Sequence, residues 1–268
     1  MTRIILTADD FGRSKERNRA IDDSFKQGLI TSAGLIVTRK DLTDAIKYIN
    51  EGGYAEKVHL HINLSTSIKD IESEDIPLTS AAREDAFLCK DGRFKRYGKL
   101  PSKFSNILKW RIVYREMVAQ YELFRNVTAG RADYTHVDFH MWFNMTWPVS
   151  LALALFTRKY HIKSVRYIGL HRMDTRRFRL YRMISWDPFV KSIPATNIDY
   201  FLSKKEQIKK SCIYELYCHP NYKDGVFLDD SPSYLGHERH SMQQQIESLK
   251  EFGDIEFVSW KDVRGKGR

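Results

Sequence analysis

The chain has 268 residues, of which 42% are hydrophobic and 13% aromatic, so it can bury the core of one large domain and is unlike a disordered chain. It carries a formal net charge of +10, but the sequence has no zinc-finger, RNA-recognition or helix-turn-helix signature, so we expect no nucleic-acid partner. No apolar run reaches the length of a membrane span, and the first residues do not resemble a signal peptide. The cysteines Cys89, Cys212 and Cys218 form no metal-type CxxC pair. We expect a reduced, cytoplasmic protein.

Strand and helix signals alternate along the chain. This alternation predicts parallel strands with helical crossovers. So many units without a linker predict a single-domain α/β fold, a (β/α) barrel, complete or partial, with an open doubly wound sheet as the alternative. Predicted strands occupy residues 3–8, 29–38, 57–64, 135–140, 163–168, 214–219 and 254–259; predicted helices lie between Ser14 and Gly28 and at 41–50, 106–126, 147–160 and 240–252.

Two segments stand apart from this alternation. Residues 65–102 are polar and interrupted by prolines, and so long a loop in a compact domain is typical of a lid over a site. Residues 172–182 hold five arginines and one aspartate, and residues 90–111 are also basic. These charges fit a solvated face, an anionic membrane surface or a phosphorylated glycan.

Polar side chains gather near the predicted carboxyl ends of the strands, where ligands bind in both candidate folds. Strand side chains alternate between two faces, so His59 and His61 share a face. His136, Asp138 and His140 share a face of their own strand. In each set the later residues lie nearer the carboxyl end, which favours His61 and His140 as site residues. The remaining strand-end candidates are Asp9, Asp10, Arg166 and His219.

Two adjacent carboxylates, Asp9 and Asp10, follow the first strand. An isolated pair of this kind is typical of a turn. Two neutral imidazoles and one carboxylate, however, can hold a divalent ion that keeps positions free for water and substrate. Such an ion would relieve the repulsion between the two carboxylates: one would bind it, and the other would stay ionised as a base.

Several motifs, in this order, resemble those of the YdjC-like carbohydrate deacetylases, a family that includes chitooligosaccharide deacetylases. LTADDFG (6–12) resembles the family's amino-terminal signature, and LITSAGLIV (29–37) is similar to the segment after its first helix. HINLS (61–65) and THVDFH (135–140) resemble its two histidine motifs, and ELYCHP (215–220) resembles its late Cys-His-Pro. The resemblance covers most of residues 1–268.

The resemblance implies a distorted, TIM-barrel-like (β/α) barrel and hydrolysis of an N-acetyl group on an amino-sugar-containing saccharide. It implies one divalent ion, with Mg²⁺ or Zn²⁺ favoured, held by Asp10, His61 and His140. It also implies Asp9 as the base and His219 as an acid or transition-state donor. Arg166 matches an arginine that would orient Asp9.

The sequence departs from the family's pattern directly after His140, where Met-Trp-Phe-Asn follows. Trp142 and Phe143, with Trp147 beyond them, are placed to stack on sugar rings, although core packing also explains them. Two alternative functions stay open: a metallo-amidohydrolase that uses the His-x-His of residues 59–61, and a non-catalytic protein that binds carbohydrate or polyanion. The oligomeric state is not fixed, and a homodimer is one candidate.

Overall fold

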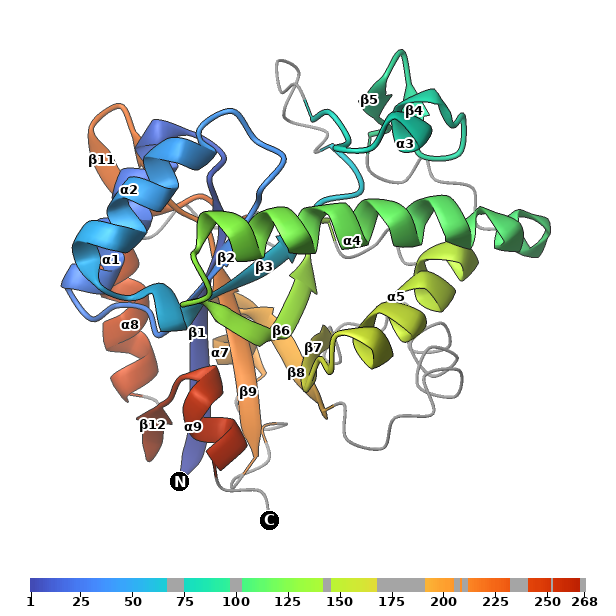
Figure 1. Ribbon diagram of the computed structural model, residues 1–268. Coiled ribbons are helices and arrows are strands. Elements are labelled where there is room, and N and C mark those ends of the chain that lie inside the picture. Colours follow the sequence, from blue (N-terminus) through green and yellow to red (C-terminus); the bar gives the residue numbers. More distant parts are fainter. Residues whose placement is uncertain are drawn as a thin grey trace.

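Seven parallel strands form a barrel at the centre of the described part of the chain in the computed structural model (Figure 1). Neighbouring strands pair in the order β1, β2, β3, β6, β7, β8, β9, and β9 pairs again with β1. The barrel is distorted because the register shifts between β1 and β2 and between β3 and β6. These strands are β1 (Thr2–Phe11), β2 (Ser32–Leu35), β3 (Val58–Ile62), β6 (Asp133–Phe139), β7 (Ser164–Tyr167), β8 (Lys191–Asn197) and β9 (Ile213–Cys218); β12 (Ile255–Phe257) pairs with the start of β1.

The structure describes residues 1–66, 75–96, 103–141, 146–167, 191–204, 208, 212–231, 241–251 and 253–265. Within them, helices surround the barrel, as the alternating pattern predicts (Figure 1). β8 and the short helix after it were not predicted. The helices are α1 (Lys15–Lys26), α2 (Leu42–Gly52), α4 (Trp110–Val127), α5 (Trp147–Lys159), α7 (Ile198–Ser203), α8 (Met242–Glu251) and α9 (Trp260–Gly265), with short 3-10 turns η1 (Ala55–Lys57) and η2 (Phe104–Lys109).

Local sequence signals explain where the helix nearest the site begins and ends. The Ser14 side chain accepts a hydrogen bond from the backbone N–H of Arg17, which caps the start of α1. Gly28 follows the last turn with φ +67, a left-handed conformation that favours glycine. The start of α1 is therefore fixed directly after the polar end of β1.

The segment predicted as a long loop, residues 65–102, contains regular structure in its described part. It includes the short helix α3 (Ser80–Glu84) and a hairpin of β4 (Cys89–Lys90) with β5 (Arg93–Phe94), which stand above α4 in Figure 1. A second hairpin, β10 (Pro220–Lys223) with β11 (Val226–Asp229), follows β9. Each hairpin turns at an Asp-Gly pair with positive φ at both residues, a sequence signal that the prediction overlooked.

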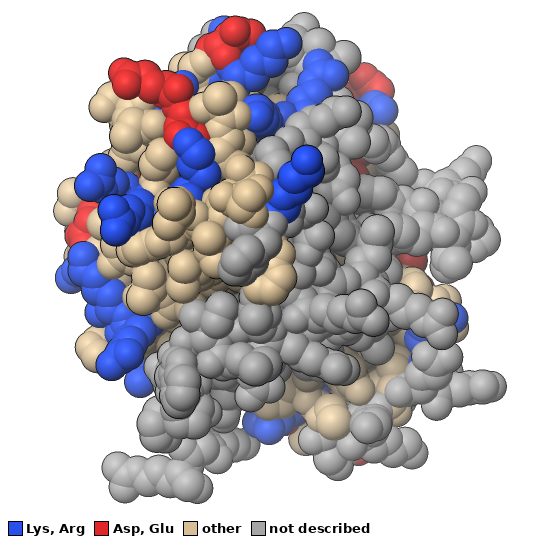
Figure 2. Space-filling model, turned by 90° about the vertical axis from the view of Figure 1, so that its right-hand side faces the viewer, with Lys and Arg blue, Asp and Glu red and all other residues tan. Residues whose placement is uncertain are grey.

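No helix in the described ranges is long and apolar enough to cross a membrane. Cys89, Cys212 and Cys218 have free thiols. Lys and Arg atoms are spread over the described part of the face in Figure 2, with Asp and Glu atoms among them. The arginine-rich residues 172–182 lie outside the described ranges.

Candidate active site

The end of β1 turns two neighbouring carboxylates toward one site. In a regular strand Asp9 and Asp10 would point to opposite faces. The register between β1 and β2 shifts between Ala8 and Phe11, and Asp10 has φ +69, so the strand is bulged at this point. Gly12 follows with φ +93, and a Cβ there would lie 2.7 Å from the carbonyl oxygen of Ile36. The backbone of the ADDFG stretch therefore bends so that the carboxylates of Asp9 and Asp10 both face the site.

Three of the sequence-predicted residues form a cluster that we call the rim cluster: Asp10, His61 and His140. One ligand atom of each lies within 4.8 Å of the others. Asp10 Oδ1 is 2.7 Å from His140 Nδ1 and 3.5 Å from His61 Nε2. All three side chains are buried. Burial alone would raise the pKa of Asp10, but the charges of His140 and Arg13 outweigh it and hold this pKa well below its usual value.

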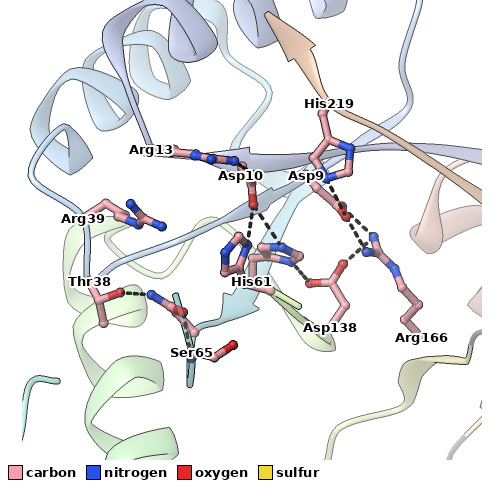
Figure 3. Close-up of polar contacts among 12 residues, drawn as sticks. Asp9, Asp10, Arg13, Thr38, Arg39, His61, Ser65, Asp138, Arg166 and His219 are labelled. Carbon is pink, nitrogen blue, oxygen red and sulfur yellow. Dashed lines mark hydrogen bonds and ion pairs between the residues drawn. The ribbon is translucent and has the colours of Figure 1, made fainter. Parts of the chain in front are cut away.

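The donor set of the rim cluster fits a divalent ion. Imidazole nitrogens and one carboxylate are common ligands of Zn²⁺ and similar ions. His140 Nε2 is buried and has no hydrogen-bond partner among the residues that the structure describes. His61 contacts Asp138 through Nδ1, at 2.5 Å from Oδ1, which leaves Nε2 directed toward Asp10 (Figure 3). A carboxylate that contacts the other ring nitrogen in this way fixes the ring orientation of a metal-binding histidine.

Asp138 affects the protonation of His61 as well as its orientation. Burial alone would lower the pKa of His61, but the negative charges of Asp138 and Asp9 and the contacts with Asp10 raise it to about 10. Asp138 itself stays ionised, because Arg166 and the neighbouring histidines outweigh its burial and lower its pKa. Asp138 lies on the same strand face as His136 and His140, as predicted, but its role was not predicted.

Asp9 lies beside the rim cluster and is held by a buried arginine. Arg166 Nη1 and Nη2 donate to Asp9 Oδ2 and Oδ1 at 2.6 and 2.7 Å, a bidentate pair (Figure 3). Arg166 Nη2 also contacts Glu215 Oε1 at 2.8 Å and Asp138 Oδ2 at 2.5 Å. Burial alone would lower the pKa of Arg166, but these three carboxylates raise it well above its usual value. The predicted Arg166–Asp9 contact is present, whereas Glu215 was missed.

His219 approaches the same carboxylate from the end of β9. Its Nε2 lies 4.0 Å from Asp9 Oδ2 (Figure 3), and its side chain is 20% exposed. Its Nδ1 is 2.9 Å from Ser231 Oγ, and Asp229 accepts a hydrogen bond from its backbone N–H. Enclosure by protein lowers the pKa of His219 below its usual value. Ser231 and Asp229 were not predicted as site residues; both follow the Asp-Gly turn between β10 and β11.

A second set of ligand-type side chains lies one layer deeper in the barrel, and we call it the inner cluster: His59, His136 and Asp138. It also satisfies a 4.8 Å separation of ligand atoms. His59 Nδ1 lies 3.1 Å from Ser32 Oγ, and the ring of His136 stacks on Trp260 with a centroid distance of 3.6 Å. His61 and His140 therefore lie nearer the carboxyl ends of their strands than His59 and His136, as predicted.

Only one of the three aromatic candidates for sugar binding lies within the described residues. Trp142 and Phe143 lie outside the described residues. Trp147 begins helix α5. Their role in binding sugar rings therefore stays a prediction.

The fold and this site together define an α/β-barrel protein with a candidate metal centre at the carboxyl end of the barrel. The family described as YdjC-like protein matches residues 3–252 of the chain. The chain belongs to the YdjC-like family, as its motifs predict.

Similar proteins cover nearly the whole chain at low identity. Carbohydrate deacetylase 2 of Listeria innocua is 24% identical over 98% of this chain and 100% of that protein. A carbohydrate deacetylase of Geobacillus stearothermophilus is 26% identical over 97% of this chain and 93% of that protein. Among solved structures, an Enterococcus faecalis protein named a "putative cellobiose-phosphate cleavage protein" superposes with a TM-score of 0.70 over 98% of each chain, at 17% identity. At that identity the last likeness shows the fold alone.

Proposed function

We propose that the protein is a metal-dependent deacetylase that hydrolyses the N-acetyl group of an amino-sugar-containing saccharide. The observation that carries this proposal is the convergence of Asp10, His61 and His140 on one point beside the Arg166-bound carboxylate of Asp9. Two relatives that align over at least 93% of their own length are named carbohydrate deacetylases, which supports this reaction class.

Asp10, His61 and His140 would hold the ion, with Mg²⁺ or Zn²⁺ as the leading candidates. A divalent ion in this position would supply Lewis-acid activation of a water molecule and of the acetyl carbonyl group. Asp138 would keep His61 in the tautomer whose Nε2 can accept the ion, because its carboxylate accepts the Nδ1–H.

Asp9 serves as the general base. It accepts a proton from the attacking water while the new C–O bond forms at the acetyl carbon. The bidentate contact with Arg166 fixes the orientation of its carboxylate before substrate binds. Because Arg166 also contacts Glu215 and Asp138, its guanidinium cannot rotate away without breaking several charged contacts.

His219 assists the departure of the amine. Its lowered pKa makes the imidazole neutral near pH 7, and a hydrogen bond from Ser231 to Nδ1 would leave the proton on Nε2. Nε2 then donates a hydrogen bond to the nitrogen of the former amide, which can accept it once the acetyl carbon is tetrahedral. As the C–N bond breaks, the proton taken up by Asp9, whose Oδ2 lies 4.0 Å from His219 Nε2, passes to that nitrogen. The immediate products are acetic acid and a free amine, which exchange one proton to give acetate and an ammonium group, so atoms and charges balance.

The two alternative functions are less well supported. A binuclear amidohydrolase site would place a second cation at His59 and Asp138. Both oxygens of Asp138 are already engaged, however, because Arg166 Nη2 lies 2.5 Å from Oδ2 and His61 Nδ1 lies 2.5 Å from Oδ1. A buried Arg166–Asp9 pair costs free energy, and a catalytic role for Asp9 would account for it; release of acetate separates an enzyme from a protein that only binds carbohydrate.

The test is release of acetate from a panel of N-acetylated saccharides, measured with added Mg²⁺ or Zn²⁺ and again after chelation. We expect turnover that is lost on chelation and restored by the ion. Absence of acetate release with every substrate and ion, from protein shown to be folded, would overturn the proposed function. Turnover unchanged by chelation would remove the metal from it.

A further inference from the structure

A basic surface lies on the insertion formed by α3 and the β4–β5 hairpin and on the start of α4 with the preceding turn η2 (Figure 1). We call the exposed side chains of residues 83–96 and 103–115 the insertion surface. These 27 residues hold nine Lys and Arg but only three Asp and Glu, and so carry six of the ten net positive charges of the chain. The ion pair of Lys109 with Asp85, at 2.8 Å, joins the two ranges. Such a concentration of charge attracts anionic partners.

The insertion is fixed to the barrel at the end that carries the rim cluster. Asn63 follows His61 by two residues, and its side chain donates to Asp75 Oδ1 at 2.9 Å. Glu116 of α4 accepts hydrogen bonds from the backbone N–H and the hydroxyl of Thr79, which caps α3, at 3.0 and 2.8 Å. The carboxylates of Asp75 and Glu116 are buried, so water does not compete for these contacts. The insertion surface is therefore held at the carboxyl end of the barrel.

Like charges lie side by side on this surface. Lys90 and Arg93 are opposite each other in the register of the β4–β5 hairpin, and both are exposed. Like charges directly opposite each other destabilise a pair of strands. Arg111 and Arg115 are both exposed and lie one turn apart on α4, which is unfavourable for the same reason. An anionic surface placed against these side chains would relieve both repulsions.

An apolar side chain is exposed among these charges. Leu108, in η2, is 75% exposed, the largest value among the large hydrophobic side chains that the structure describes. Trp110 follows it and is half-buried, with the guanidinium of Arg111 at 5.7 Å from its ring. A face that is only solvated gains nothing from a leucine in this position. Leucine and tryptophan flanked by basic side chains are typical of protein surfaces that lie in the headgroup region of a membrane.

We propose that the insertion surface docks the protein onto a membrane that contains anionic lipids, with Leu108 and Trp110 entering the headgroup region. Lys and Arg side chains attract the anionic headgroups, and the apolar side chains are buried at the interface. Nucleic acid would account for the charge but not for the exposed leucine within it. Docking would turn the carboxyl end of the barrel toward the bilayer. This inference goes beyond the proposed function and does not depend on it.

The test measures how much of the protein sediments with lipid vesicles in the absence of substrate. Vesicles of phosphatidylcholine alone are compared with vesicles that also contain phosphatidylglycerol, an anionic lipid. We expect binding to the anionic vesicles to be at least about tenfold tighter than to the neutral ones. Most of this difference should vanish in about 1 M NaCl, where the screening length falls to about 3 Å.

Two double variants assign the electrostatic part of the binding. Lys90→Glu with Arg93→Glu should weaken binding to anionic vesicles by at least about tenfold, because each basic residue near the headgroups contributes about fivefold. Lys223→Glu with Lys250→Glu changes the net charge equally but alters exposed lysines of β10 and α8, away from the insertion in Figure 1. This control should lose less than about threefold.

A second matched pair of variants assigns the apolar part. Leu108→Ser should weaken binding to anionic vesicles by roughly tenfold, because it removes apolar area that would be buried in the interface. Val226→Ser is the control: Val226 is 59% exposed, but it lies in the β10–β11 hairpin. Its binding should equal that of the wild type.

Equal binding to the two kinds of vesicle, or equal losses in the two double variants, would overturn the proposal. Unchanged binding of Leu108→Ser would do the same, because the surface would then attract any polyanion. Binding to duplex DNA without binding to vesicles would assign the surface to nucleic acid instead. If Lys90→Glu with Arg93→Glu does not fold, Arg111→Glu with Arg115→Glu takes its place. Because no substrate is used, failure of this proposal is distinguishable from failure of the proposed function.

Discussion

The rim cluster and the inner cluster are built from the same side chains, yet their surroundings give them different capacities. Both are buried, and both bring two imidazoles and a carboxylate within 4.8 Å. In the inner cluster both oxygens of Asp138 contact groups outside the cluster: Arg166 lies at Oδ2 and His61 at Oδ1. In the rim cluster Arg13 contacts Oδ2 of Asp10, and Oδ1 faces His61 and His140. Ligand spacing alone therefore does not define a metal site: the contacts that each carboxylate oxygen already makes decide which cluster can accept a cation.

The largest effect on turnover is expected from a change in Asp9, which belongs to neither cluster. Asp9→Asn removes the base but none of the three proposed ligands, so kcat for deacetylation should fall by roughly 10²–10⁴-fold. Metal content, measured by elemental analysis, should not change. Asp224→Asn, in the left-handed turn between β10 and β11, is the control and should keep wild-type turnover. Near-normal turnover of Asp9→Asn would exclude Asp9 as the base.

The next prediction compares the two clusters directly. His61→Ala removes a rim ligand and should weaken metal binding by at least about 100-fold, more than the loss typical of changing a residue that only hydrogen-bonds to a ligand. His59→Asn alters the inner cluster, two residues away on the same strand, and should change the affinity by less than about tenfold. Titration calorimetry measures both affinities. A larger loss in His59→Asn than in His61→Ala would place the ion in the inner cluster.

The pKa of His61 predicts how metal binding depends on pH. In the metal-free protein this pKa is raised to about 10, so at neutral pH the ring is protonated and must lose a proton to bind the ion. Affinity should therefore rise by about one log unit per pH unit below pH 10 and level off above it. Because the pKa is raised, the metal-free protein should also lose stability as pH rises from 6.5 through 10.

Calorimetry in buffers of different ionisation enthalpy would count the protons released on binding. Release of about one proton per ion at pH 7 to 8 is expected. Binding with no proton release would contradict the assignment of His61 as a ligand.

The smallest expected effect concerns the packing behind His61. A Cβ on Gly34 would lie 3.0 Å from His61 Cβ and 3.1 Å from its Nδ1. Gly34→Ala should shift the ring, weaken metal binding several-fold and lower the free energy of unfolding by about 1–3 kcal/mol. Titration calorimetry and thermal unfolding would measure the two effects. Unchanged affinity would show that the ring is not confined from this side.

The sequence predicts the barrel and the position of the rim cluster well, for identifiable physical reasons. Alternating strands and helices imply a parallel barrel, and the side-chain period of two places His61 and His140 on inward faces. The carboxyl-end rule then selects them over His59 and His136. Each step depends on local periodicity, which a single sequence carries.

Other features depend on contacts between distant segments, which local periodicity does not encode. Glu215 reaches Arg166 across 49 positions of the sequence. Strand β8 contains Pro194, which weakens its strand signal. The bulge at Asp10 arises from pairing with β2, so adjacent carboxylates alone did not reveal it. The two hairpins, in contrast, carried a readable Asp-Gly signal.

The central claim is that Asp10, His61 and His140 share one divalent ion next to Asp9. The most direct measurement is anomalous diffraction from crystals grown with Mn²⁺ or Zn²⁺. We expect one anomalous peak within coordination distance of all three side chains, at about 2.0–2.2 Å for Zn²⁺. A peak in the inner cluster, or no peak at the rim at saturating ion, would contradict it.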